Sequence, residues 1–139
     1  MSRADTFTPL SGTREIYSDF LVNLDSNPMT GALGKISNEA AVRRSIMNLI
    51  TTNMGERMFQ PNLGSDVYRA LFEPLDQIAA SSLQRAVKNV ITYHEPRANL
   101  LSVTVYPGVD RNTMVVNVIF SLINSNKPVS LDVILRRVR

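Results

Sequence analysis

The chain has 139 residues, of which 44% are hydrophobic and 19% charged, and its formal net charge is +3. This length suits one domain with a real core, and the ordinary globular composition excludes wholesale disorder. The sequence has no apolar run of about 18 residues and no apolar signal-peptide core, so neither a membrane span nor secretion is expected. The absence of cysteine excludes a disulfide framework and a thiolate metal site.

The first part of the chain is predicted to be mostly irregular. Residues 1–16 are polar and are expected to form a flexible N-terminal arm, whereas residues 17–139 are expected to form a single domain. The segment "YSDFLVNL" (17–24) favours a short strand. Glycine and proline in "DSNPMTGALGK" (25–35) then indicate a loop.

Apolar residues recur at helical spacing after this loop and predict a helix over 38–53. Ser37 or Asn38 can cap its start, and Glu39 places a negative charge where the first N–H groups lack partners. Gly55 follows where a left-handed terminator is expected. The stripe that this helix is expected to bury comprises Val42, Ile46, Leu49 and Ile50.

A turn-rich linker (55–74) follows the first helix and contains a predicted short helix over 66–72. Ser65 can cap this short helix, because its hydroxyl can accept a bond from an unpaired N–H. Leu71 and Phe72 are expected to anchor the linker to the core.

A second long helix is predicted to begin at Pro74, whose fixed φ suits the first helical position. Pro96 disfavours helical geometry at Glu95, so the helix should end near Tyr93 or His94. Its expected apolar stripe comprises Leu75, Ile78, Ala79, Leu83, Ala86, Val87, Val90 and Ile91.

The apolar period changes from 3.6 to 2 after this helix, which predicts three strands. Turn residues at 107–112 and in "NSNKP" (124–128) separate them, and the second strand is apolar on both faces, as a central strand is. The predicted inward residues are Leu101, Val103 and Val105, then Met114, Val116, Val118, Phe120 and Leu122, then Val129, Leu131, Val133 and Leu135. We therefore expect an α+β fold, with two main helices packed on a small antiparallel sheet: a three-stranded C-terminal meander, with or without one N-terminal strand.

No pattern in the sequence points strongly to catalysis. His94 is the only histidine, and at a helix C-terminus it suits the helix dipole better than a metal, so we expect no metal and no cofactor. Glu39, Glu56, Glu73 and Glu95 could supply a carboxylate pair for cell-wall glycoside hydrolysis. The chain has no tryptophan to line a sugar cleft, however, which disfavours a lysozyme-like enzyme.

Much of the positive charge lies at the end of the chain, in Arg136, Arg137 and Arg139, and Lys127 lies just upstream of the last strand. Direct nucleic-acid binding is not expected, because only Phe120 and Tyr106 could stack on bases nearby. If this strand lies at the sheet edge, its charges could serve only to shield unpaired main-chain groups. Alternatively, the edge could stay open to accept a partner's strand by β-augmentation. The residues alone leave both interpretations open.

Two segments carry a resemblance to a known family. "EAAVRRSIMNLITTNMGERMFQPNLGSDVYRALFEP", a helix, and then "YHEPRANLLSVTVYP" resemble the sheath-initiator, baseplate wedge family of contractile phage tails and of type VI secretion. The resemblance covers residues 37–138. Its specificity comes from the order and spacing of short motifs, above all the Glu-Pro-Arg sequence at 95–97.

The resemblance implies a structural protein that is not an enzyme. Its expected partners are other baseplate wedge proteins, and the tail sheath protein, whose first ring it would template by strand exchange. Six copies per baseplate are expected, in a virion tail assembled in the host cytoplasm. The resemblance implies wedge contact at Glu95, Pro96 and Arg97, to which we add Glu56 and Arg57. It implies sheath contact on the final strands, at Val129, Leu131, Val133, Leu135, Arg136 and Arg137.

The two charges around Pro96 admit two roles. In an extended segment, Glu95 and Arg97 point to the same side and could form a rigid polar connector for a wedge partner. They could also hydrogen-bond internally, with Glu56 and Arg57, and brace the joint between helix and strand. An internally braced pair would also be better preorganised for a contact, so the two roles are compatible.

Overall fold

Three antiparallel strands form the sheet around which the chain is arranged. In the computed structural model, which describes residues 14–72, 77–108 and 112–136, they are β3 (Ala98–Pro107), β4 (Thr113–Leu122) and β5 (Ser125–Arg136). β4 lies in the middle, where Val116 pairs with Val105 on one side and Val133 on the other. The predicted C-terminal meander and its central strand are confirmed.

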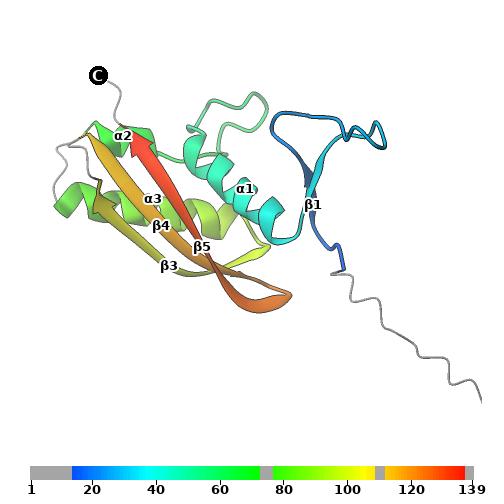
Figure 1. Cartoon of the computed structure of the whole chain (residues 1–139). Helices are drawn as coiled ribbons and strands as arrows, with labels where there is room; N and C mark the ends of the chain where they lie inside the picture. The colour runs from blue at the N-terminus through cyan, green and yellow to red at the C-terminus, as the bar shows by residue number, and fades with distance from the viewer. Residues whose placement is uncertain (1–13, 73–76, 109–111, 137–139) are drawn as a thin grey trace, which may run out of the picture.

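The helices cover one face of this sheet (Figure 1). α1 (Glu39–Thr51) and α3 (Gln77–His94) are the two long helices, and α2 (Val67–Leu71) is a short one between them. Each long helix buries a stripe at helical spacing against the inward residues of the strands. The larger side chains that are almost completely buried include Val42, Ile46, Ile50, Leu71, Leu83, Val87, Ile91, Val116, Val118 and Phe120. Burying each large aliphatic or aromatic side chain contributes about 1.5–3 kcal/mol. The predicted α+β architecture is confirmed.

The N-terminal region adds a pair of strands instead of one. β1 (Ser18–Phe20) and β2 (Lys35–Ser37) form a separate two-stranded antiparallel sheet beside the start of α1 (Figure 1). The predicted strand over 17–24 is thus shorter than expected, and the predicted loop reaches into β2. The loop closes where the N–H of Gly31, at φ 67°, donates to the carbonyl of Asn27.

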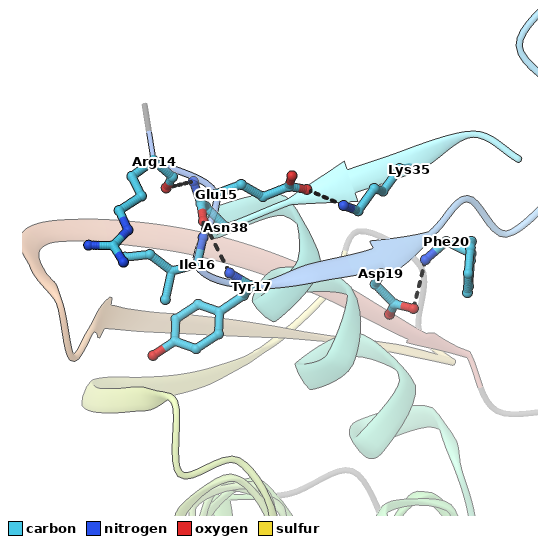
Figure 2. A network of polar contacts seen from close by, with 8 residues as sticks. All are labelled: Arg14, Glu15, Ile16, Tyr17, Asp19, Phe20, Lys35 and Asn38. Atoms are coloured by element: carbon cyan, nitrogen blue, oxygen red, sulfur yellow. Dashed lines mark hydrogen bonds and ion pairs between the residues drawn. The ribbon is translucent and has the colours of Figure 1, made fainter. Parts of the chain in front are cut away.

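Asn38 joins this N-terminal segment to α1 (Figure 2). It is the N-cap residue, but its side chain makes no capping bond, so that part of the prediction is wrong. Its Oδ1 instead accepts bonds from the N–H groups of Ile16 and Tyr17, and its Nδ2 donates to the carbonyl of Arg14. Of the predicted arm over 1–16, residues 14–16 are therefore hydrogen-bonded to the domain, and residues 1–13 lie outside the described part.

The linker also uses its polar residues differently from the prediction. Ser65 does not cap α2; its buried hydroxyl donates to the carbonyl of Ile50 at 2.7 Å. Gly55 has a left-handed φ of 81° but does not terminate α1, which ends at Thr51 with an extended Thr52. The N–H of Gly55 instead closes the linker loop by donating to the carbonyl of Pro61.

Three apolar residues predicted to be inward are exposed, each for a geometric reason. α2 ends at Leu71, which is buried, and Phe72 at its C-cap lies on the surface. Ile78 is exposed because it lies about 100° around the helix from its neighbour Ala79, where the buried stripe of α3 begins. Leu101 is the extra residue of a β-bulge, so Leu100 turns toward the core in its place.

The turn before β5 is shorter than predicted. Ile123 and Asn124 make the turn, and Ser125 already pairs with Leu122. A second register shift next to Ser121 accommodates the intervening residues. Pro74 and Leu75 of the predicted second helix lie outside the described residues, whereas its end at His94 is as predicted.

We expect Gly64→Ala to lower the free energy of unfolding by more than about 2 kcal/mol. Gly64 has φ 129°, and a Cβ there would lie 2.7 Å from the carbonyl oxygen of Thr52. Gly31→Ala is the matched control, since Gly31 has φ 67° with open space around it, and it should cost about 1 kcal/mol. Urea unfolding followed by circular dichroism measures both, and equal losses would contradict this account of Gly64.

Candidate functional site

The candidate site centres on the joint between α3 and β3. The N–H of Glu95 still donates to the carbonyl of Ile91, and the N–H of Ala98 donates to the carbonyl of Glu95. Residues 95–98 therefore form a turn, and the extended geometry predicted for this segment is wrong. The predicted consequence still holds, because the turn brings the side chains of Glu95 and Arg97 together.

Glu95 and Arg97 form a bidentate ion pair. The Arg97 Nε donates to Glu95 Oε1 at 2.6 Å, and its Nη2 donates to Oε2 at 2.8 Å. Glu95 is only 2% exposed, whereas the Arg97 side chain is 35% exposed. A buried carboxylate that lost this partner would cost about 3–5 kcal/mol, so Arg97 is required to keep Glu95 charged inside the protein.

The protonation of the pair follows from these contacts. Burial alone would raise the pKa of the Glu95 carboxyl, but the hydrogen bonds from Arg97 and Ser45 and the positive charge of Arg97 outweigh it. The pKa of Glu95 is therefore lower than its ordinary value. The bond to Glu95 raises the pKa of Arg97 in turn, against the opposing effect of burial. Both groups are thus charged at neutral pH.

Arg97 also connects the joint to two distant parts of the chain. Its guanidinium lies over the ring of Tyr17, 5.6 Å from the centroid, in a cation–π contact. The Tyr17 hydroxyl accepts a bond from Asn124, and the carbonyl of Arg97 accepts one from the N–H of Ile123. The joint therefore holds together the N-terminal segment, the end of α3 and the turn between β4 and β5.

Glu56 and Arg57 do not join this ion pair. The Glu56 carboxylate accepts the N–H of Asn53 at 2.9 Å and so stabilises its own loop. Within the described residues, no hydrogen bond or ion pair links Glu56 or Arg57 to Glu95 or Arg97. Arg57 does line the same surface hollow, of about 320 Å³, as Glu95, Pro96 and Arg97. The predicted brace is therefore internal to Glu95 and Arg97, with Arg57 beside it.

The second candidate feature is the edge of the sheet formed by β5. In the described part of the chain, β5 pairs only with β4, so its other side is an open edge. The side chains of Val129, Leu131, Val133 and Leu135 are buried in the core, as predicted from their alternation. A partner at this edge would therefore meet main-chain groups and the exposed face, which includes Arg136; Arg137 lies outside the described residues.

Several contacts of the site could not be found from the sequence. Tyr17, Ser45 and Asn124 are far from the Glu-Pro-Arg segment along the chain, and no local pattern marks them as its neighbours. Only the adjacent charges signalled the pair itself. The described residues contain no cluster of three or more His, Cys, Asp or Glu side chains suited to a metal ion, and none of the described helices is long and apolar enough to cross a membrane.

The fold and the site together define a two-layer α+β domain with a braced helix–strand joint and an open sheet edge. Residues 36–127 match the model of the family described as baseplate wedge protein gp25, and the chain belongs to this family. This confirms the resemblance drawn from the sequence motifs.

Three individual proteins are similar to the chain. It is 33% identical over 119 residues to baseplate wedge protein gp25 of Enterobacteria phage T4, covering 84% of this chain and 87% of that protein. A crystal structure from Geobacter sulfurreducens, described as a "putative tail lysozyme", matches with TM-score 0.69 and 23% identity over 75% of this chain and 96% of the other. The baseplate of the anti-feeding prophage contains a chain that matches with TM-score 0.61 and 19% identity over 85% and 83%. The last two likenesses establish a shared fold.

We expect the stability of the protein to fall in acid through Glu95. Because its pKa is lower in the folded state, its contribution is complete above the unfolded carboxyl pKa of about 4.3 and is lost as pH falls through the folded value. Glu95→Gln should therefore lose less stability than the parent between about pH 6 and pH 3, measured by urea unfolding. Glu15→Gln, which removes an exposed carboxylate, is the control and should follow the parent. If Glu95→Gln showed the parent's full acid loss, the ion pair would not be the cause.

Proposed function

We propose that this protein is a structural, non-enzymatic subunit of a contractile-tail baseplate that docks on neighbouring wedge subunits and templates the first sheath ring by strand exchange. The observation that carries the proposal is the open edge of β5, in a chain that belongs to the baseplate wedge family. Because the alternate side chains of β5 are fixed in the core, its main-chain donors and acceptors are held in a strand geometry that a partner strand can pair with.

The charged joint supports the docking half of the proposal. Glu95 is buried and internally paired, so a wedge subunit would contact Pro96, the exposed part of Arg97 and the neighbouring Arg57. The pair needs no rearrangement before binding, which lowers the cost of ordering this surface. Glu56 supports the loop that carries Arg57 and is not itself a contact in this proposal.

Symmetric assembly would strengthen both contacts. A single added strand is a small interface, so stable sheath binding would require several edges presented together. Six copies per baseplate would meet this requirement in a tail with sixfold symmetry. Such a subunit would act in the virion, after assembly in the host cytoplasm.

The glutamates of the chain disfavour the alternative of a cell-wall glycoside hydrolase. A general acid in such an enzyme needs a raised pKa, whereas the pKa of Glu95 is lowered by its partners. Glu39 pairs with Arg43, and Glu56 accepts a main-chain bond. Glu73 lies outside the described residues. The likeness to the Geobacter protein described as a tail lysozyme concerns the fold and does not supply an acid–nucleophile pair.

Photo-cross-linking tests the strand pairing at the edge of β5. Ser130 on β5 and Ser102 on β3 are exposed on the same row of the sheet, because both pair with Ile119 of β4. They therefore form a matched pair on opposite edges. A benzophenone amino acid at position 130 should capture the sheath protein in assembled tails, and the same group at position 102 should not. Sheath capture from position 102 alone, or capture at 130 of this chain's own residues alone, would contradict the proposal.

Arg57→Glu tests wedge docking without breaking the ion pair. Arg57 lines the hollow at the joint but has no bond to Glu95 or Arg97 within the described residues, so the variant should fold like the parent. Its recovery with wedge subunits in pull-down experiments should fall about tenfold or more, because a charge at the contact is reversed. Arg69→Glu makes the same charge change at an exposed position of α2 that lines neither hollow at the joint, and it serves as the control. Equal recovery of the two variants would remove Arg57 from the docking surface.

A further inference from the structure

An open groove of about 650 Å³ lies beside β5, on the side of the sheet that faces the helices. Leu131 of β5 forms one wall, residues 39–47 of α1 form another, and Leu21, Val22 and Ile36 line the end near β1 and β2. Figure 1 shows α1 alongside β5. A strand paired with β5 would point alternate side chains to the same face as Leu131. Those side chains would enter this groove.

Three apolar side chains that line the groove are exposed to solvent. Leu21, Val22 and Met47 are 39%, 56% and 41% exposed, although Leu131 beside them is buried. Neighbouring exposed apolar side chains that line a concave surface are typical of a surface that is covered in a complex. The groove therefore suits apolar side chains.

One charged group in the groove lacks a partner. The Nε of Arg44 is buried and has no hydrogen-bond partner among the described residues. The adjacent Arg43 is different, because Glu39 already neutralises it at 3.4 Å. Arg44 as a whole is half-buried in the groove wall, and no ion pair among the described residues neutralises its charge. An incoming carboxylate would pair with the outer guanidinium N–H groups of Arg44, and not with the enclosed Nε.

We propose that this groove binds and recognises the side chains of the strand that pairs with β5. The incoming strand carries apolar residues at alternate positions and, among them, one Asp or Glu whose carboxylate binds Arg44. This inference rests on the proposed strand pairing and adds its specificity: main-chain bonds give attachment, while the groove selects the sequence and fixes the register.

Arg44→Gln tests the polar contact. The substitution removes an unpaired buried donor, so the melting temperature of the isolated protein should equal or exceed that of the parent. The fraction of baseplates that carry sheath should fall about tenfold or more, because a charge-assisted bond of the complex is lost. Lys88→Gln removes an equal charge from α3 and should leave that fraction within about twofold. A lower melting temperature for Arg44→Gln, or an unchanged sheath fraction, overturns the assignment.

A benzophenone amino acid at Met47 tests the apolar contact, with Ser130 as its companion position. Capture of one sheath segment from both positions, with alternating apolar residues and an acidic residue in the captured peptide, is the expected result. Capture from 130 but not from 47 overturns the groove assignment and leaves strand pairing intact. Capture at 47 of a wedge subunit or of residues 1–13 of this chain also overturns it. Sheath capture from neither position removes the strand-pairing proposal itself.

Discussion

The buried carboxylate of Glu95 is the constraint on which the arrangement of this molecule depends. A charge that is 2% exposed is tolerable only with a fixed counter-charge, and Arg97 supplies it through two short hydrogen bonds. Because Arg97 also lies over Tyr17, and its carbonyl accepts the N–H of Ile123, the same pair fixes the N-terminal segment and the turn that begins β5. One ion pair thus aligns segments that are distant in the sequence.

This coupling connects the two surfaces that we assign to partners. The exposed part of the joint, at Pro96 and Arg97, lies at the start of β3, and β5 follows directly from the turn that Arg97 holds. A wedge subunit bound at the joint would therefore hold the open edge of β5 in a set orientation. Beside that edge, Arg44 and the exposed apolar residues of the groove give a strand partner more than main-chain groups to recognise. The same domain would then bind a wedge subunit at the joint and a sheath strand at the edge of β5.

Local patterns predicted the parts of the fold that depend on neighbouring residues. The stripe of α1, the end of α3 before Pro96 and the alternation of β5 follow from helical or strand periodicity and from proline geometry. The bulge at Leu101 was missed because Leu100 and Leu101 are both apolar, so either phase of the strand fits the pattern. Asn38 was expected to cap a helix because its alternative acceptors and donors, in residues 14–17, become adjacent only in the fold. The sequence marked Glu95 and Arg97 as a pair of interest but could not reveal the burial of Glu95 or the contacts of the pair with Tyr17, Ser45 and Ile123.

A density map of the assembled baseplate with its first sheath ring tests the central claim most directly. The account predicts a foreign strand along the outer edge of β5, at the usual spacing of about 4.8 Å between paired strands, with the Glu95–Arg97 pair intact at the wedge contact. A map in which that edge is open to solvent, or is covered by this chain's own residues while the sheath binds elsewhere, would contradict it.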